Sequence, residues 1–302
     1  MKNTDSVLGI KSKVRACLFP DRNTDPIPIR ESIFLATIPT AQIRENPTLA
    51  GWLEPGTTHG TLGPGRFILS RPLHGHMYGV QFIDVDHDEP GPVDGNWNIS
   101  ADMTALRALF NDFNPITRAY MQVIQQAEKW QIAVGPELKT WRSRHGRVVL
   151  LGDAAHAMIP HAAQGLSQGI EDGISLAKML HAAAINSRRI STITQAWEQL
   201  RKPRAELFVQ RSMNNARIRS LPDGPAQLAR DEQIIKSSQV APKELSNIAM
   251  DMNANQNSPE FMKWVREYDV VSEVREFQFT TLTTLGNTAL IMKHRPRKCS
   301  RA

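Results

Sequence analysis

The sequence has little cysteine and no long apolar run. Its 302 residues include two cysteines, Cys17 and Cys299, too few for a disulfide-stapled scaffold and without the Cys/His spacing typical of a zinc site, so no metal site is expected. No run of about 18 apolar residues is present, which argues against a transmembrane helix. The first residues also lack the apolar core of a signal peptide. We therefore expect a soluble, cytoplasmic protein.

Net positive charge is also small outside the C-terminus. The formal net charge is +6. Five of these charges come from residues near the end of the chain, Lys293, Arg295, Arg297, Lys298 and Arg301, which leaves +1 for the rest of the chain. A nucleic-acid-binding protein carries a basic face on its folded body, so we expect no nucleic-acid partner. The basic tail is either a solvated C-terminus or a signal that contacts an anionic surface.

The two halves of the chain differ in their residue patterns. Hydrophobic residues make up 41% of the chain, enough for a sizeable core. Strand-like runs cover 32–38, 66–73 and 77–85, and His74-Gly75-His76 is typical of a hairpin turn. These runs predict a sheet with one covered face. The second half predicts long helices, and the fold class is therefore mixed α/β (α+β).

The helices are predicted from apolar spacing and from their ends. Ser100 is the expected N-cap of a helix whose apolar residues recur at helical spacing: Met103, Leu106, Leu109 and Phe110. A second short helix is expected through Tyr120 and Ile124, and an extended run over 129–141. Later helices are predicted over 165–184, 194–221 and about 259–277. Pro203 is expected to kink or split the second of these.

Most of the chemical information lies between residues 146 and 180. An apolar run, 147–151, predicts a buried strand that ends at Gly152-Asp153. A carboxylate at the end of a strand, after a glycine that permits close approach, suits a sugar-like hydroxyl group. The following loop leads into a helix at Gly165, whose N-terminus favours an anion or a carbonyl that gains negative charge.

Other residues of this segment leave two interpretations open. Gly165, Gly169 and Gly173 are spaced four apart on one helix face, which indicates close packing by either a ligand or an adjoining strand. His156 and His161 follow the predicted strand. Each is either a catalytic group or a hydrogen-bonded structural residue.

Three further patterns fit known motifs only superficially. Gly165-Leu-Ser167-Gln-Gly169 matches the G-x-S-x-G of a hydrolase nucleophile elbow, but no β-run leads into it. The run 60–65 resembles a phosphate loop, yet Pro64 removes an N–H group and no Lys-Ser/Thr follows. The acidic run 84–89 lacks the glycine and glutamate of a calcium loop. We interpret these as a chance match, a turn and a solvated loop.

The segment 146–180 resembles the flavin-binding motif of FAD-dependent aromatic-ring monooxygenases, the salicylate hydroxylase-like group A flavoprotein monooxygenases. The segments 129–141, 200–204 and 221–224 resemble this family in the same order, and 9–15 resembles the end of its second flavin motif. The resemblance covers most of the chain. It implies FAD as cofactor, NAD(P)H as reductant, and hydroxylation of an aromatic or polycyclic small molecule with O2, a reaction expected in secondary metabolism.

The resemblance also assigns roles to single residues. Asp153 would hydrogen-bond the ribityl chain of FAD, and Pro160 would lie near the isoalloxazine ring. The backbone around Gln164, Gly165 and Leu166 would meet the pyrimidine edge of the flavin. No catalytic residue is assigned. The sheet formed by residues 32–85 would cover the substrate pocket.

The sequence departs from the family in three places. It contains no G-x-G-x-x-G, the fingerprint that holds the ADP half of FAD, so we expect a chain without the N-terminal dinucleotide-binding segment. Leu8 precedes Gly9 where the second flavin motif has aspartate, and Phe34-Leu35 stands where some relatives carry an aromatic-Arg pair. Without the fingerprint, contacts to the isoalloxazine and ribityl groups alone predict weak FAD binding. The sheet edge and apolar surface that the absent strands would cover predict poor solubility unless a protein partner covers the gap. These departures also leave open a non-catalytic remnant that acts as an accessory or binding protein.

The expected organisation has four parts. Residues 1–31 would be a remnant of the FAD-binding region, and 32–141 the sheet and helices of a substrate domain. Residues 142–222 would hold the FAD-binding strand, loop and helices. Residues 223–302 would form a C-terminal helical region with the basic tail.

Overall fold

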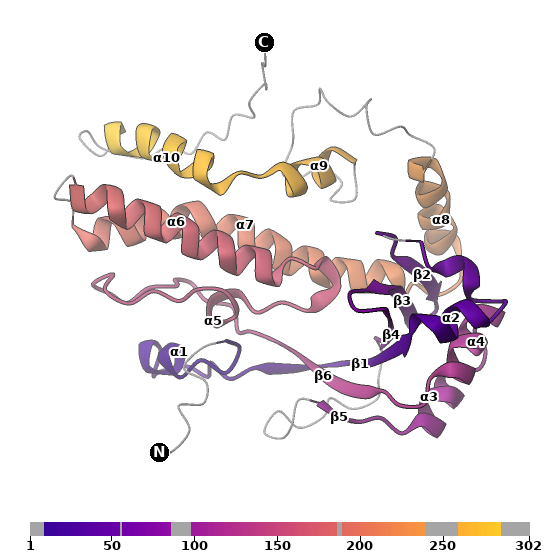
Figure 1. Cartoon of the computed structure of the whole chain (residues 1–302). Coiled ribbons are helices and arrows are strands. Elements are labelled where there is room, and N and C mark those ends of the chain that lie inside the picture. Colours follow the sequence, from indigo (N-terminus) through magenta and orange to yellow (C-terminus); the bar gives the residue numbers. More distant parts are fainter. Residues whose placement is uncertain (1–8, 55, 86–97, 186–188, 239–258, 285–302) are drawn as a thin grey trace, which may run out of the picture. The chain divides into compact units, whose positions relative to one another are not determined.

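The computed structural model describes residues 9–54, 56–85, 98–185, 189–238 and 259–284 (Figure 1). The chain divides into two compact units. Unit 1 combines 1–25, 135–212 and 229–302, and unit 2 combines 26–134 and 213–228. The basic tail and the acidic residues 86–89 lie outside the described residues.

Unit 2 is built on a six-stranded antiparallel sheet with the order β2-β3-β4-β1-β6-β5. The strands are β1 (Ile27–Pro39), β2 (His59–Gly63), β3 (Arg66–Leu73), β4 (Met77–Asp84), β5 (Asn98–Ser100) and β6 (Glu128–Val134). The three strands predicted in the first half are confirmed. The predicted hairpin turn is confirmed as well, since Leu73 pairs with Met77 and both Gly75 and His76 have positive φ.

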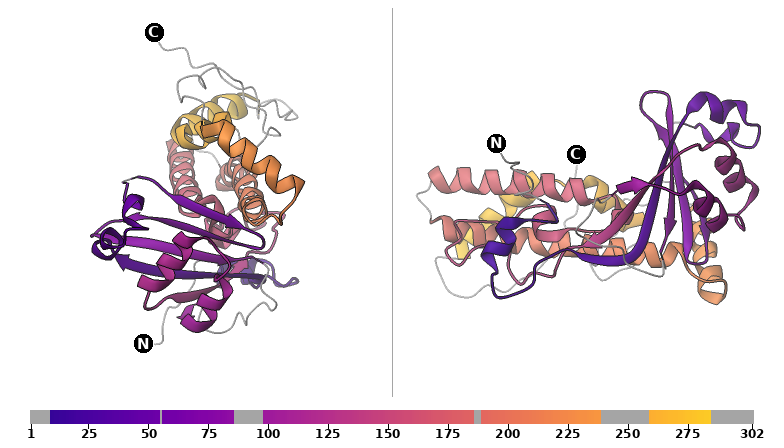
Figure 2. Two further views of the ribbon diagram at one scale, coloured as in Figure 1. Left: turned by 90° about the vertical axis from the view of Figure 1, so that its right-hand side faces the viewer. Right: turned by 90° about the horizontal axis from the view of Figure 1, so that it is seen from below.

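Short helices cover one face of this sheet (Figure 2, left). They are α2 (Thr40–Glu45), the 3-10 turn η1 (Ala50–Trp52), α3 (Met103–Leu109) and α4 (Pro115–Val123). The predicted cap of α3 is wrong by two residues. Ser100 belongs to β5, and the Asp102 carboxylate accepts hydrogen bonds from Thr104 N and Ala105 N at 2.8 and 3.2 Å.

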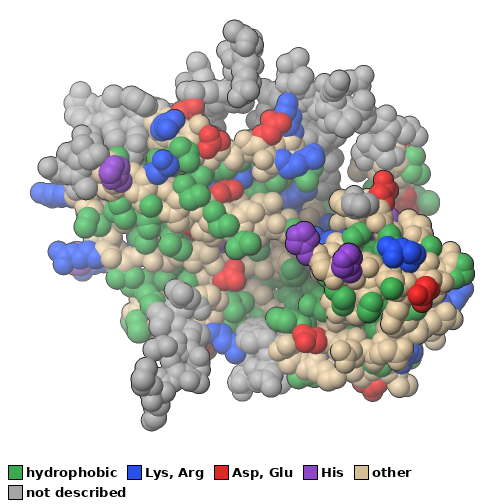
Figure 3. All heavy atoms as spheres, viewed as in Figure 1, with side chains coloured by type: hydrophobic (Ala, Val, Ile, Leu, Met, Phe, Trp, Pro, Cys, Tyr) green, Lys and Arg blue, Asp and Glu red, His purple; other side chains and the backbone are tan. Residues whose placement is uncertain are grey.

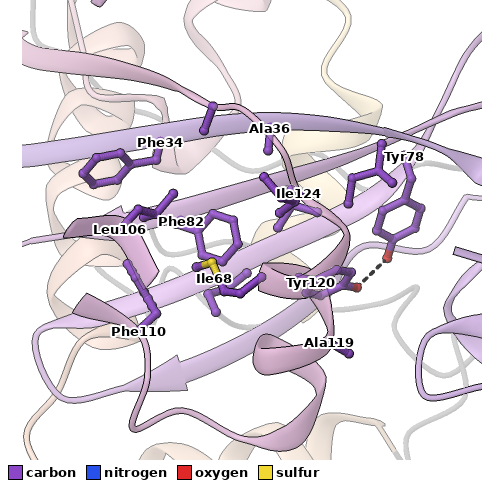
Figure 4. Close-up of a cluster of buried hydrophobic side chains, with 14 of the residues drawn as sticks. Phe34, Ala36, Ile68, Tyr78, Phe82, Leu106, Phe110, Ala119, Tyr120 and Ile124 are labelled. Carbon is purple, nitrogen blue, oxygen red and sulfur yellow. Dashed lines mark hydrogen bonds between the residues drawn. The ribbon is translucent and has the colours of Figure 1, made fainter. Parts of the chain in front are cut away.

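The core of unit 2 lies between the sheet and these helices (Figure 4). It contains a hydroxyl cluster in which Ser70, Tyr78 and Tyr120 hydrogen-bond one another at 3.0–3.2 Å. The expectation of a single covered face is incomplete, because the opposite face also carries buried residues: Ile33, Phe67 and Ile83.

Unit 1 is mainly helical. Its elements are α1 (Lys13–Leu18), α5 (Asp153–His156), the 3-10 turn η2 (Pro160–Ala162), α6 (Gly165–Ile185), most of α7 (Ile190–Arg219) and of α8 (Pro225–Ser238), α9 (Pro259–Glu267) and α10 (Val270–Thr284). Its core gathers around Trp141 and Trp197 and includes Val274 of α10. None of the described helices is long and apolar enough to cross a membrane.

Three local predictions for this unit need correction. The run 147–151 is not a strand of a sheet, because among the described residues it pairs only with 141–143, through a single bridge between Val149 and Arg142. Pro203 lies inside α7, so the expected split is wrong, and the expected kink stays a prediction. The helix expected over 259–277 is two helices, since Asp269 caps α10 through Val271 N at 2.9 Å. The mixed α/β class itself is confirmed.

Candidate functional site

A sharp turn at Gly152 presents Asp153. Gly152 has φ 53° and ψ −138°, a conformation that nearly requires glycine, and it precedes α5. Asp153 is the first residue of α5 and is exposed, whereas the three residues after it are buried. The backbone therefore directs one carboxylate outward from an otherwise buried short helix.

The carboxylate of Asp172, on α6, holds this turn from the inside. Asp172 is fully buried, and its Oδ2 accepts hydrogen bonds from Gly152 N at 3.0 Å and from His156 Nε2 at 2.7 Å. Its Oδ1 accepts one from Arg201 Nε at 2.9 Å. Burial alone would raise the pKa of Asp172, but His156, Arg201 and the Gly152 N–H together hold it below the ordinary value. Asp172 is thus a buried carboxylate with charged and polar partners.

His156 is a buried structural residue of this cluster. Because a carboxylate only accepts hydrogen bonds, the Nε2 atom that faces Asp172 carries the proton. The Trp141 ring packs against the imidazole with its centroid 5.0 Å away, and no described residue hydrogen-bonds Nδ1. Of the two interpretations left open by the sequence, the structure supports hydrogen bonding and packing. His161 is buried as well.

A second layer of charges lies behind Asp172. Arg201 is fully buried and also donates to Glu171 Oε2 at 2.7 Å and to Gln168 Oε1 at 2.8 Å. Arg204 donates two bonds to the same Glu171 carboxylate, at 2.8 and 3.0 Å. These pairs join α6 to α7 along one face.

The turn is held from the opposite side by Arg15. This arginine is 1% exposed and donates to Ala154 O at 3.1 Å and to Thr24 O at 2.7 Å, with a further bond to Ile10 O. Burial lowers the pKa of the Arg15 guanidinium, while Asp25 opposes that shift. The segment 9–15, singled out in the sequence, thus reaches the residue that follows Asp153.

The loop after α5 leads to the N-terminus of α6. Pro160 begins η2 and is exposed, and Ala163 adopts a left-handed conformation with φ 52°. The Gln164 carbonyl accepts the Gln168 N–H at 2.9 Å, Gly165 is the first residue of α6, and Leu166 is 81% exposed. The first N–H groups of an α-helix have no acceptor within the helix and are available to a ligand.

The three glycines of α6 differ in their surroundings. Gly169 packs against the Gly152 turn: a Cβ added at either glycine would lie 3.7 Å from the Cα of the other. A Cβ at Gly173 would meet nothing within 4 Å. Beside them runs an exposed apolar stripe of Leu166, Ile170 and Ile174, and Figure 3 shows hydrophobic side chains over the part of the surface where α6 lies.

The other motifs remain outside this arrangement. Ser167 lies in the first turn of α6, after η2 and not at a strand-to-helix turn, so the hydrolase geometry is absent from the described segment. The run 60–65 forms most of β2 and the turn into β3.

Sequence reasoning missed the residues that hold the turn. Asp172 and Arg201 are 29 residues apart, and no local pattern connects them. The available signal was the spacing of charges, with Glu171-Asp172 on one predicted helix and Arg201 and Arg204 three apart on the next. Such residues on long helices indicate ion pairs between the helices.

Comparison with known proteins shows what this segment is similar to. A family model described as FAD binding domain matches residues 111–212, which include the Gly152 turn and α6. The FAD-dependent monooxygenase OpS4 of Beauveria bassiana (strain ARSEF 2860) is 27% identical over 231 residues, which are 76% of this chain and 53% of that protein. Salicylate hydroxylase of Pseudomonas putida is 32% identical over 166 residues, which are 54% of this chain and 38% of that protein.

The fold agrees with these matches. A salicylate hydroxylase structure with substrate superimposes with a TM-score of 0.70 and 22% identity, over 89% of this chain and 62% of that one. The chain spans about half the length of OpS4 and less of the salicylate hydroxylase sequence. The resemblance inferred from the residues is therefore confirmed: the chain is a homologue of the salicylate hydroxylase-like FAD-dependent monooxygenases.

Proposed function

We propose that this chain holds the flavin of an FAD-dependent monooxygenase that hydroxylates an aromatic or polycyclic small molecule with NAD(P)H and O2. The observation that carries the proposal is the exposed Asp153 carboxylate, set on a turn that buried charges fix, within the segment matched by the FAD-binding family. Bound FAD would supply the redox chemistry. The names of the relatives support the enzyme over the alternative of a non-catalytic remnant.

The described residues fit such a cofactor. Asp153 would accept hydrogen bonds from ribityl hydroxyl groups, and the glycine before it adopts the φ of 53° at which the backbone turns into α5. The N-terminus of α6, at Gln164, Gly165 and Leu166, would face the pyrimidine edge, where its positive dipole favours negative charge. Pro160 would lie near the isoalloxazine ring.

The substrate class and the biological setting rest on the relatives. Salicylate hydroxylase acts, by its name, on an aromatic acid, so we propose an aromatic substrate that lies against the sheet of residues 32–85. We further propose that the protein acts in secondary metabolism, that it is located in the cytoplasm, and that a protein partner completes its flavin site.

Titration of the purified chain with FAD tests the proposal. Saturable binding, followed by flavin fluorescence and the 450 nm absorption band, is expected to weaken about tenfold or more in Asp153→Ala, because a charge-assisted hydrogen bond is lost. Glu137→Ala is the matched control, since Glu137 is an exposed carboxylate of the same unit outside the segment 152–174. No binding by a folded wild-type chain would overturn the proposal. Binding would lead to assays of NAD(P)H oxidation with aromatic acids and phenols.

A further inference from the structure

We propose that Asp172 is a positioning residue for the flavin: through the Gly152 N–H and His156 it fixes the turn that presents Asp153. The inference rests on the proposed function and adds a residue to it. Asp172 does not need to touch the ligand, because its effect is transmitted through Gly152 and α5.

Asp172 is connected to the segment that carries Asp153 by two direct hydrogen bonds. Oδ2 of Asp172 joins both ends of the segment 152–156, since it accepts from Gly152 N at 3.0 Å and from His156 Nε2 at 2.7 Å. Asp153 lies between these two anchors. A turn with φ 53° and ψ −138° lies outside the broad minima, so hydrogen bonds that over-determine it decide where its side chains point.

The carboxylate is itself held rigidly. Arg201 binds Oδ1 at 2.9 Å, and both side chains are 0% exposed, so Asp172 cannot turn toward water instead. A buried charge with two charged or polar partners on one oxygen and an arginine on the other has little freedom. A change in the position or the charge of the Asp172 carboxylate is therefore expected to change the conformation of the Gly152 turn.

Glu171 provides a matched control on the same helix. In the described part of the chain its carboxylate is bound by Gln168, Arg201 and Arg204, which lie on α6 and α7. Glu171→Gln removes a carboxylate from the same cluster but leaves the bonds to Gly152 and His156 in place. It separates general weakening of the α6–α7 contact from release of the turn.

The decisive measurement is a double-mutant cycle on FAD affinity. Asp172→Asn is expected to raise the dissociation constant of the full chain about tenfold or more, since displacement of a binding group by about 1 Å is costly. If Asp172 acts through Asp153, adding Asp172→Asn to Asp153→Ala should change the constant less than twofold. Glu171→Gln should also change it less than twofold.

A second readout needs no flavin. Amide exchange of Gly152 should be slow in the wild-type chain and in Glu171→Gln, and at least tenfold faster in Asp172→Asn. If Asp172→Asn does not fold, His156→Leu replaces it in both measurements, because leucine has no donor for Asp172 Oδ2 and the bond from His156 is lost.

The outcomes separate this inference from the proposed function. If the wild-type chain binds FAD and the folded Asp172→Asn variant has an unchanged dissociation constant, the positioning role is overturned and the flavin site stands. The same holds if the increases in the dissociation constant caused by Asp172→Asn and Asp153→Ala multiply in the double variant. Equal exchange of Gly152 in all variants also overturns the positioning role. Absence of FAD binding by the folded wild-type chain overturns the proposed function and this inference with it.

Discussion

The Gly152 backbone N–H donates a 3.0 Å hydrogen bond to Oδ2 of Asp172, and thereby ties an exposed turn to the middle of a helix 20 residues later. The acceptor of this hydrogen bond, the Asp172 carboxylate, is fully buried. The hydrogen bond explains how the chain can hold an outward-facing carboxylate, Asp153, in one place although no residue in the described ranges hydrogen-bonds that carboxylate. The same contact has a consequence for stability.

Asp172→Asn should destabilise the chain in a pH-dependent way. Loss of the charge leaves the buried Arg201 without one of its two carboxylate partners, which costs about 3 kcal/mol at neutral pH. Because the folded-state pKa of Asp172 is lowered from 3.8, the stability it contributes is complete above the unfolded-state value and is lost as the pH falls through the folded-state value.

Urea unfolding of the wild type and Asp172→Asn at pH 7, 5, 4 and 3 measures this difference. The two free energies of unfolding should differ by a constant amount at pH 7 and 5 and converge below pH 4. A difference that grows as the pH falls would contradict the sign of the shift.

Two glycines of the same region should respond oppositely to alanine. Gly152→Ala forces a side chain into a backbone conformation that favours glycine, and the cost should be about 1–3 kcal/mol although the added Cβ meets only ordinary contacts. Gly173→Ala should stabilise the chain by up to about 1 kcal/mol, since Gly173 lies inside α6 and its Cβ has open space. Thermal unfolding of both variants checks the pair, and equal effects would show that the φ of Gly152 is not constrained.

The sequence predicts those parts of the structure whose signal is local. The hairpin of β3 and β4 follows from two β-forming runs around Gly75, and α6 follows from its apolar spacing. The run 147–151 has the same local signal as a strand, but a strand also needs neighbours, and the described chain offers it only 141–143. Local pattern alone cannot supply that information.

The same limit applies to the candidate site. Asp153 and the start of α6 were identified from glycines and a carboxylate in a short segment. Asp172 was not, because its partners Gly152, His156 and Arg201 lie 16 to 29 residues away and meet only in the folded chain. Pro203 is a related case: α7 stays continuous around it, with buried Arg201, Arg204 and Ala205 on either side.

Arg204→Lys should weaken the attachment of α9 to α7. The guanidinium binds Glu171 through two bonds and lies over the rings of Trp264 and Tyr268, 4.3 and 3.4 Å from their centroids. Lysine cannot reproduce a planar fork that stacks on aromatic rings, so a loss of about 2 kcal/mol is expected. Lys202→Ala, which removes an i,i+4 pair with Glu206 on the same helix, should cost at most about 0.5 kcal/mol.

Urea unfolding, followed by tryptophan fluorescence, measures the free energy of unfolding of Arg204→Lys and Lys202→Ala. The emission of the native Arg204 variant should shift to longer wavelength as Trp264 gains contact with water, whereas Lys202→Ala should leave it unchanged. Equal losses of stability in the two variants would show that the stacked geometry contributes nothing.

Tyr268 should make the folded chain sensitive to alkaline pH. Burial raises its pKa from 10.0 to about 12, although Arg201 and Arg204 beside it act in the opposite direction. The phenol therefore contributes stability that is fully present below pH 10, where the unfolded chain is also neutral at this residue. That contribution is lost as the pH rises toward 12, by up to about 2–3 kcal/mol.

Comparison with Tyr268→Phe isolates this effect, because the other alkaline titrations of the chain are common to both proteins. The difference in absorbance at 295 nm between the two folded chains should have its midpoint near pH 12. Wild-type stability should fall relative to the phenylalanine variant between pH 10 and 12, and remain parallel to it below pH 10. A midpoint near 10 would mean that Tyr268 is in contact with water, and the stacking of α9 on Arg204 would then not bury it in solution.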